Sequence, residues 1–297
     1  MTKCALITGA SGFIASHLAK KLLSSGWKIG LLVRPHSQLD SQLLSAKIYS
    51  YDGTLGSIDQ CLKDLKPNIV FHLASLFISE HKPQDIPALI DSNILFGTQL
   101  LESMTSHQVH HLINTGTSWQ HFNGDPYHPV NLYAATKQAF EAILQYYVEA
   151  KHIRCITLKL FDSYGPDDHR KKLVNLLIAS ASKDEHLELS PGEQLIDLVY
   201  IDDIVKAFLI ATEQLDKQKY LSHEIYGLSS GTRISIRQLA DIISRLSGKA
   251  LTVSWSARAY REREVMDPWL PSANLPDWEP QVSLEQGISN LLSRAHN

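Results

Sequence analysis

The fold is decided by the N-terminal stretch Cys4-Ala5-Leu6-Ile7-Thr8-Gly9-Ala10-Ser11-Gly12-Phe13-Ile14-Ala15. Its first residues form a short apolar run, which predicts a buried β-strand over 4–7. A glycine turn follows, and then an amphipathic segment that Ser25-Gly26 ends, which predicts a helix over 13–24. A strand, a glycine turn and a helix in this order predict the first unit of a dinucleotide-binding α/β domain.

The turn between this strand and this helix is suited to a pyrophosphate group. Its glycines permit a tight turn and let the backbone approach a ligand at the helix N-terminus. Glycine usually occupies a third small position, which here is Ala15. A bare glycine turn without a ligand is the plainer alternative. We expect the cofactor to contact Gly9, Ser11, Gly12, Phe13 and Ile14.

Apolar runs alternate with helical patterns along the first part of the chain, as expected of a parallel sheet with helical crossovers. Prolines punctuate shorter elements after about residue 165, while 198–212 predicts a strand and a helix that return to the first domain. The fold class is therefore α/β, a Rossmann doubly wound parallel sheet with a smaller C-terminal α/β substrate-binding lobe. We assign 1–165 and 196–228 to the dinucleotide-binding domain, and 166–195 and 229–297 to the lobe. Strands are predicted at 4–7, 29–33, 47–50, 69–73, 111–115 and 155–160, and helices at 13–24, 57–65, 88–106 and 132–150.

Composition indicates a soluble enzyme. The chain has 297 residues, 44% of them hydrophobic, and a net charge of -3, which gives no reason to expect nucleic acid or a membrane surface as a partner. No apolar run reaches the roughly 18 residues of a membrane span, so we expect a cytoplasmic protein. Cys4, Cys61 and Cys155 are odd in number and well separated, which predicts reduced thiols. Histidines cluster at 110–128 without the spacing of metal ligands, so no metal site is expected.

A candidate acid–base pair lies in Asn131-Leu132-Tyr133-Ala134-Ala135-Thr136-Lys137. Tyr133 and Lys137 are four residues apart at the start of a predicted helix, so they share one helix face. There the Lys137 charge and the helix dipole favour the phenolate of Tyr133, whose ordinary pKa is about 10. Such a tyrosine can donate a proton to a carbonyl oxygen as hydride arrives, or accept one in the reverse direction. A packed ring beside a solvated lysine is the plainer alternative.

The second predicted strand ends in Leu31-Leu32-Val33-Arg34-Pro35, where the choice of dinucleotide is usually made. A carboxylate here would bind the ribose 2′-OH of NAD, whereas an arginine pairs with the 2′-phosphate of NADP. Arg34 therefore predicts NADPH as the cofactor, with a solvated arginine at a strand end as the alternative. After the third strand, the Asp52 carboxylate beside Gly53 is a candidate partner for the adenine amino group.

Several motifs follow one another along the chain. They are Thr8-Gly-x-x-Gly12, Phe71-His72-Leu73-Ala74-Ser75, Asn93, Leu112 to Ser118, Tyr133-x-x-x-Lys137, Tyr164-Gly165-Pro166, Val199 to Asp203 and Trp278-x-Pro280-x-Val282-x-Leu284. In this order they make the chain resemble the extended short-chain dehydrogenase/reductase family over nearly its whole length.

The resemblance implies a catalytic triad of Thr117, Tyr133 and Lys137, with Thr117 bonding the substrate oxygen and Lys137 also holding the nicotinamide ribose. It implies cofactor contacts at Leu73 and Ala74 as well. Ser118 is the alternative to Thr117 if the strand ends one residue later.

Members of this family act mostly on nucleotide-activated sugars. The 4,6-dehydratases carry Asp-Glu directly after the active-site Ser/Thr, where this chain has Ser118 and Trp119. The 4-epimerases typically keep NAD bound by a carboxylate at the position of Arg34. The resemblance thus implies an NADPH-dependent reductase of the 4-keto group of a nucleotide-activated 6-deoxy or 3,6-dideoxy hexose, as in O-antigen (lipopolysaccharide) or other deoxysugar biosynthesis. A 4-epimerase, a non-sugar ketone reductase and a non-catalytic NADP-sensing protein are the alternatives.

The resemblance is less informative about the substrate's diphosphate, which the family often holds with two arginines. Ile196 takes the place of the first, and the second falls on Arg261. The run Arg170-Lys171-Lys172 is a candidate to compensate, although a charge run is often only a solvated face. Asp162 stands where many relatives have Asn, and the sequence does not explain it. The expected substrate contacts are Ser118, Trp119, Arg170, Lys171, Asn175 and Arg261.

A homodimer is also expected. Relatives commonly pair the helices that correspond to 88–106 and 132–150 into a four-helix bundle across a two-fold axis. Both segments have apolar faces in this chain. The plainer alternative is that those faces only pack on the sheet.

Overall fold

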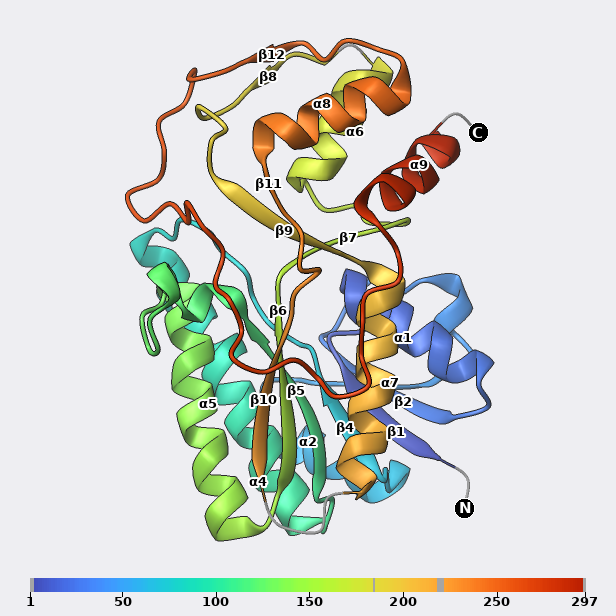
Figure 1. Ribbon diagram of the computed structural model, residues 1–297. Helices are drawn as coiled ribbons and strands as arrows, with labels where there is room; N and C mark the ends of the chain where they lie inside the picture. Colours follow the sequence, from blue (N-terminus) through green and yellow to red (C-terminus); the bar gives the residue numbers. More distant parts are fainter. Residues whose placement is uncertain (1–2, 184, 218–221, 296–297) are drawn as a thin grey trace.

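A parallel sheet with helices on both faces forms the centre of the molecule (Figure 1). The structure, a computed structural model, describes residues 3–183, 185–217 and 222–295. Within them the sheet has seven strands in the order β10-β6-β5-β4-β1-β2-β3. The Rossmann-type fold predicted from the sequence is thus confirmed. The strands are β1 (Cys4–Thr8), β2 (Lys28–Val33), β3 (Lys47–Ser50), β4 (Ile69–His72), β5 (His111–Thr117), β6 (Arg154–Leu160) and β10 (His223–Leu228).

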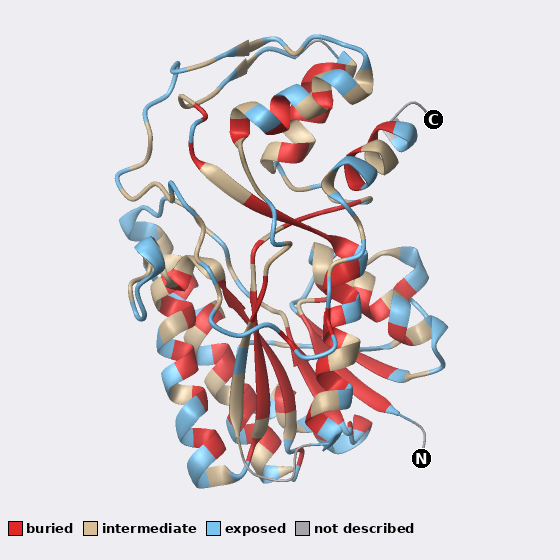
Figure 2. Ribbon diagram, viewed as in Figure 1, coloured by how far each residue is buried: buried red, intermediate tan, exposed pale blue. Residues whose placement is uncertain are grey.

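The helices that cover this sheet are α1 (Phe13–Ser24), α2 (Leu55–Leu65), α4 (Phe96–Ser106), α5 (Leu132–Lys151) and α7 (Ile201–Lys217). In β1, Ala5 and Ile7 join the core under α1 and α7, whereas Leu6 joins the core under α2, α4 and α5. Figure 2 shows the central strands buried throughout and the helices buried mainly on their sheet-facing sides. Burial on both faces explains why these strands are almost continuously apolar. None of the described helices is long and apolar enough to cross a membrane.

The predicted helix over 88–106 is interrupted. The structure has α3 (Ile86–Ile90), a π-helical turn over Asp91–Leu95 and then α4. Asn93 is buried in this turn, where its side chain bonds the backbone of Leu76 and the Thr136 hydroxyl. A π-turn often marks a functional site, and here it places a polar side chain between two elements. The other predicted strands and helices lie within two residues of the observed ones. The three cysteines are free and buried, as predicted.

A smaller α/β region lies beyond the carboxyl ends of the large sheet (Figure 1). The chain passes directly from β6 into it, and β9 leads back into α7, which matches the strand and helix predicted at 198–212. The domain boundaries that we assigned from the sequence remain a prediction. The elements of this region are β7 (Asp162–Tyr164), β9 (Leu195–Tyr200) and β11 (Arg233–Ser235) in one sheet, β8 (Leu187–Glu188) paired with β12 (Val253–Ser254), and the helices α6 (Leu173–Lys183), α8 (Ile236–Ser247) and α9 (Leu284–Ala295).

The strand order reverses at β1, which lies between β4 and β2. In open α/β sheets, ligands bind outside the carboxyl ends of the strands at such a switch point. The loops after β1 and β4 separate here, because the chain crosses to α1 on one face and toward α4 on the other. We therefore expect a cofactor to bind at this edge of the sheet.

Candidate active site

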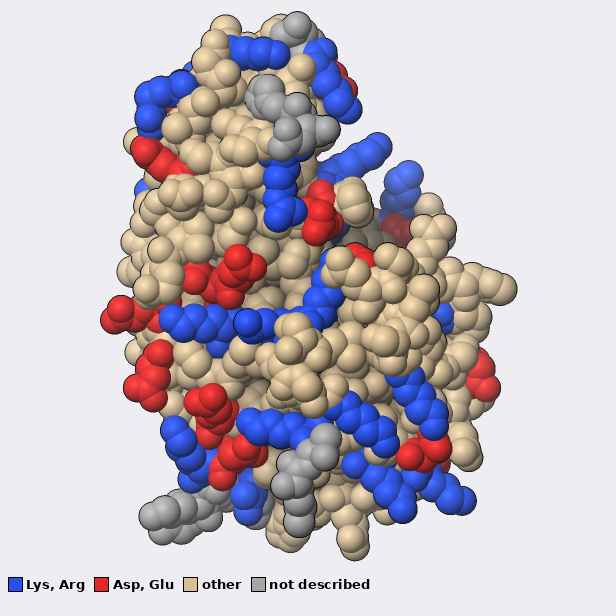
Figure 3. Space-filling model, turned by 90° about the vertical axis from the view of Figure 1, so that its right-hand side faces the viewer, with Lys and Arg blue, Asp and Glu red and all other residues tan. Residues whose placement is uncertain are grey.

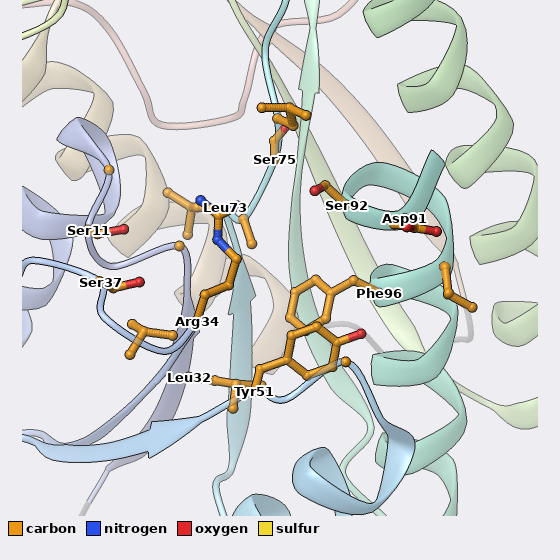
Figure 4. Close-up of a pocket in the computed structure, with 17 residues that line it drawn as sticks. Ser11, Leu32, Arg34, Ser37, Tyr51, Leu73, Ser75, Asp91, Ser92 and Phe96 are labelled. Carbon is orange, nitrogen blue, oxygen red and sulfur yellow. The ribbon is translucent and has the colours of Figure 1, made fainter. Parts of the chain in front are cut away.

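A cavity of about 510 Å³ opens at this switch point (Figure 4). Gly9 lines it with φ +76°, and a Cβ at this position would lie 2.7 Å from the Ala74 backbone nitrogen, so only glycine fits. Gly12 is the N-cap of α1 and has no side chain to cap the first turn, so the N–H groups there are open to a ligand. Ser11 and Leu73 line the same cavity. The arrangement fits the pyrophosphate of a nicotinamide dinucleotide.

Arg34 extends into this cavity from the end of β2 (Figure 4). Its side chain is exposed and forms no ion pair within the part of the chain that the structure describes. Ser11 and Ser37 line the cavity on the same side. A guanidinium group without a carboxylate partner is available to an anion such as a ribose phosphate.

The opposite wall of the cavity is aromatic. The ring of Tyr51 lies 4.6 Å from that of Phe96, and its hydroxyl donates a hydrogen bond to Gln99 Oε1 at 2.7 Å. Gly53 also lines the cavity, but Asp52, which lies between Tyr51 and Gly53 in the sequence, does not. The Asp52 carboxylate instead accepts hydrogen bonds from the Thr54 backbone N–H and hydroxyl, at 3.0 and 2.7 Å, in the turn before α2.

Tyr51 is thus a candidate adenine contact that the sequence analysis missed. The available signal was its position directly after β3, at the same carboxyl edge as the other loops. A flat ring at that edge stacks on a base more readily than a carboxylate that already caps a turn.

A second cavity, of about 270 Å³, continues from the first and contains the predicted reaction centre. Asn131 accepts a hydrogen bond from the Ala134 N–H at 3.0 Å and so caps α5. Tyr133 and Lys137 therefore lie in the first two turns of this helix. Lys137 is buried, while Tyr133 lines the cavity. The other predicted residues here are Gly9, Gly12, Phe13, Ile14, Leu73, Thr117, Ser118 and Trp119.

Burial, rather than the lysine charge, dominates the ionisation of Tyr133. It raises the pKa of the phenol, and the Ser75 and Thr117 side chains only partly oppose this. The expectation that Lys137 would favour the phenolate is therefore not met in this structure. Burial lowers the pKa of Lys137 to about 8, against the opposing charge of Glu141. At neutral pH the site holds a protonated phenol and a protonated amine, which suits an acid that donates to a carbonyl.

The strand that was predicted to end at 115 extends to Thr117. β5 ends at Thr117, whose hydroxyl accepts a hydrogen bond from the Trp119 N–H at 3.3 Å, while its backbone N–H donates to Gln120 Oε1. The Thr117 side chain lowers the pKa of the Tyr133 phenol, against the larger effect of burial. Ser118 lines both the reaction centre and the neighbouring cavity. Of Thr117 and Ser118, Thr117 is the residue that could bond the same substrate oxygen as Tyr133.

A third cavity, of about 310 Å³, leads from the reaction centre to the smaller region and contains Arg261. Arg261 donates to both carboxylate oxygens of Glu264, at 2.9 and 2.7 Å, and its guanidinium lies 5.2 Å from the centre of the Trp119 ring. Ile196, which stands in place of the family's other arginine, lines the same cavity. The two cavities share Phe77, Ser118, Trp119, Phe161, Asp162, Ser163 and Lys172.

The expected substrate contacts at Arg170, Lys171 and Asn175 lie in three different settings. Arg170 lines the reaction centre, where it binds Asp168 at 2.6 Å and lies over the Phe13 ring. Lys171 is exposed and is not among the residues that line the three cavities. Asn175 donates to the backbone oxygens of Asp168 and Arg170, so it holds this loop rather than lining a cavity.

Lys172 is the member of the charge run at 170–172 that the list of expected substrate contacts left out. It lines both the reaction centre and the third cavity, with its ammonium group 4.4 Å from the centre of the Phe77 ring. The same group lies 3.8 Å from an oxygen of Asp162. The carboxylate at Asp162, unexplained by the sequence, therefore has a basic neighbour.

Charged side chains of both signs lie interspersed on the face of the molecule that Figure 3 shows. Within the described ranges, no group of three or more His, Cys, Asp or Glu side chains could hold a metal ion.

These features define a Rossmann-type enzyme with a nicotinamide dinucleotide site, a Tyr–Lys pair beside it and a separate substrate cavity. The family model described as the NAD dependent epimerase/dehydratase family matches residues 5–225. Because this match covers most of the chain, the chain belongs to that family and is an NAD(P)-dependent enzyme acting on CH–OH and C=O groups. The resemblance found in the sequence is thereby confirmed.

Known proteins of this kind are similar to the chain over nearly its full length. CDP-abequose synthase of Yersinia pseudotuberculosis is 30% identical over 264 residues, 89% of this chain and 90% of that protein. A Thermus thermophilus UDP-glucose 4-epimerase in complex with NAD has a TM-score of 0.83 at 22% identity, covering 99% of both chains. A Thermotoga maritima UDP-glucose 4-epimerase with UDP-glucose has a TM-score of 0.86 at 22% identity, covering 98% of this chain and 97% of that one. At these identities the structures show the shared fold.

Proposed function

We propose that the protein is an NADPH-dependent reductase of the 4-keto group of a nucleotide-activated 6-deoxy or 3,6-dideoxy hexose. Such a reaction belongs to deoxysugar biosynthesis, including that of lipopolysaccharide O-antigens. The observation that carries the proposal is Arg34 in the cofactor cavity, without an acidic partner in the described chain. The similarity to CDP-abequose synthase supports the substrate class.

The residues of the reaction centre suit a reduction. NADPH, when bound, would supply the hydride to the carbonyl carbon. Tyr133 would donate its phenolic proton to the carbonyl oxygen, and Thr117 would bond the same oxygen and orient it. Lys137 would hold the nicotinamide ribose with its buried ammonium group. A phenol whose pKa is raised keeps its proton at neutral pH, which a reductase needs from its acid.

The neighbouring positions oppose elimination. A 4,6-dehydratase needs an acid and a base next to the active-site hydroxyl. Ser118 and Trp119 occupy those places and line the reaction centre, and neither side chain is a carboxylate. A dehydratase reaction would therefore lack its proton-transfer groups here.

Two cations are the candidates for the substrate diphosphate. Arg261 and Lys172 both line the cavity that leads from the reaction centre, although each has an acidic neighbour. Arg170 lies closer to the cofactor loop, since it lines the reaction centre over the Phe13 ring. We therefore propose Lys172 with Arg261, in place of Lys171, as the diphosphate contacts.

A 4-epimerase is the second candidate, because solved 4-epimerases share this fold over almost the whole chain. An epimerase transfers hydride away from the sugar and back, so it consumes no cofactor, and it must retain the oxidised form. The Arg34 position disfavours this reading. A screen for NADPH oxidation with CDP-, dTDP-, GDP- and UDP-linked 4-keto-6-deoxy sugars separates the two, because only a reductase consumes NADPH. Conversion of a nucleotide sugar without net NADPH loss would favour the epimerase.

We also propose that the protein is a homodimer through α4 and α5. Ile90, at the end of α3 within the predicted helix over 88–106, is 38% exposed, and Tyr146 on α5 is 55% exposed. Isologous pairing of this face across a two-fold axis would cover both. A mass by light scattering near the 33.3 kDa of one chain, at micromolar concentration, would contradict the dimer.

A further inference from the structure

Two opposite charges are buried beneath the reaction centre. Lys159 on β6 and Glu141 on α5 expose 4% and 5% of their side chains, and the Lys159 ammonium lies 3.3 Å from a Glu141 oxygen. Buried charges are costly unless they are paired, and well-packed apolar residues could often replace such a pair without loss of stability. The pair therefore invites a role other than stability.

One end of this pair reaches the catalytic lysine. Glu141 follows Lys137 by four residues on α5, so the two lie on one face of the helix. The Glu141 charge raises the pKa of Lys137 against the effect of burial. The pair also packs against the backbone of β5, because a Cβ at Gly116 would lie 2.8 Å from Lys159 Cγ and 2.9 Å from Glu141 Oε1. Gly116 directly precedes Thr117.

The other end reaches the wall of the substrate cavity. Lys159 Nζ lies 2.8 Å from His121 Nε2. An ammonium group only donates, so His121 accepts at Nε2 and carries its own proton at Nδ1, which lies 3.3 Å from the Asp125 carbonyl oxygen. Burial and the Lys159 charge lower the pKa of His121 to about 4, which keeps the ring neutral.

The neutral His121 ring lies flat on Trp269, with centroids 4.1 Å apart and planes at 16°. Trp269 is in turn parallel to Phe161, at 6.0 Å and 3°. All three rings line the third cavity, and Phe161 also lines the reaction centre. They come from the loop after β5, the end of β6 and the C-terminal segment, so the stack ties the smaller region to the catalytic domain. We call these three rings the aromatic wall.

We propose that Lys159 is a positioning residue, which holds His121 in one tautomer and orientation and so fixes the aromatic wall against the hexose ring of the substrate. The inference rests on the proposed function, because it assigns a sugar to this cavity. The hexose, rather than the base, is the ring concerned, because Phe161 borders the cavity that contains Tyr133. The flat apolar face of a deoxy sugar suits parallel rings of this kind.

A double variant tests this role without unfolding the protein. Lys159→Met alone would leave Glu141 charged and buried without its partner, so we combine it with Glu141→Gln, which conserves volume and leaves no unpaired charge. Calorimetry then measures the binding of CDP and CDP-glucose, and of UDP and UDP-glucose, in the presence of NADP. The difference within each pair isolates the contribution of the sugar.

We expect the double variant to bind the free nucleotide within about twofold of the unmodified protein, and the nucleotide sugar about tenfold more weakly. Trp269→Leu should have the same effect. In a His121→Ala background, the double variant should weaken binding of the nucleotide sugar little further. The effects of residues that act through one another are not additive. A merely structural pair would give equal losses for nucleotide and nucleotide sugar, or losses that add to that of His121→Ala.

Each outcome has a distinct meaning. A folded double variant with unchanged affinity for the nucleotide sugar would overturn the positioning role and leave the proposed function standing. If the unmodified protein binds neither nucleotide sugar more tightly than the free nucleotide, the assignment of a sugar to the cavity fails, and the inference fails with it.

Discussion

The ammonium group of Lys172 lies 3.8 Å from the Asp162 carboxylate, where the reaction centre meets the substrate cavity. Many relatives have Asn at the position of Asp162, and a carboxylate near a diphosphate would by itself be repulsive. The pair explains the exchange, because the basic neighbour balances the added charge. Of the two adjacent lysines, Lys172 lines this cavity and Lys171 is exposed.

Lys172→Met should raise the KM for the nucleotide sugar more than it lowers kcat, because binding of the diphosphate acts on ground state and transition state alike. Hydrogen bonds to charged groups contribute roughly 1.5–3 kcal/mol, so we expect a loss of about tenfold to a hundredfold in kcat/KM. Lys171→Met is the matched control, since Lys171 is exposed and outside the cavities. Equal effects of the two substitutions on steady-state kinetics would show that this pocket does not hold the diphosphate.

Tyr133→Phe should abolish turnover while NADPH binding, measured by fluorescence titration, stays nearly intact. General acid catalysis typically contributes about 10²–10⁴-fold, and phenylalanine keeps the ring without the proton. Retention of activity within about threefold of the unmodified enzyme is incompatible with a catalytic Tyr133.

Two further substitutions, at Thr117 and Ser118, test which residue at the end of β5 acts with Tyr133. Thr117→Val should be severely impaired, whereas Ser118→Ala should be mild, because of these two side chains only that of Thr117 affects the pKa of the phenol. The opposite order would mean that Ser118 bonds the substrate oxygen.

Activity should fall as pH rises through the pKa of Lys137. That pKa is lowered to about 8, so the amine is protonated below this pH and neutral above it, while the raised pKa of Tyr133 keeps the phenol protonated. We expect kcat/KM for NADPH, which reports the free enzyme, to decline above pH about 8. Glu141→Gln should move the decline to lower pH, because Glu141 raises the pKa of Lys137. A flat profile to pH about 10, the ordinary range of lysine, would argue against this ionisation.

Arg34→Asp should lower kcat/KM with NADPH and so reduce the difference in kcat/KM between NADPH and NADH. The substitution replaces a charge-assisted pair with the 2′-phosphate by repulsion, while NADH has no phosphate to lose. Both cofactors are to be measured on both proteins, so that NADH serves as the internal control for folding. Equal use of NADH and NADPH by the unmodified protein would remove the basis for assigning Arg34 to the phosphate.

The parts of this molecule that were predictable from sequence depend on neighbours along the chain. The glycine turn after β1 and the Tyr133–Lys137 spacing each lie within a single strand–turn–helix or helix segment, so local patterns suffice to place them. The end of β5 was placed less well, because the strand was predicted to end at 115 and extends to Thr117.

The parts that were missed depend on contacts across the fold. Lys172 differs from Lys171 only by the direction in which the loop after β7 turns, which the sequence does not encode locally. The pairing of Glu141 with Lys159 joins a helix to a strand, and the side chain of Asn93 in the π-turn bonds Thr136 on another helix. Asp52 was misjudged because its carboxylate bonds the next turn and not the cavity.

Transfer of deuterium from labelled NADPH is the most direct test of the central claim that this enzyme reduces a nucleotide-linked 4-keto sugar. With NADPH carrying deuterium at the transferred position, the account predicts that one deuterium atom appears on C4 of the product for each NADPH consumed. An epimerase would return a product without deuterium and leave NADPH unchanged. A labelled product from simple ketones, with none from any nucleotide-linked keto sugar, would likewise contradict the account.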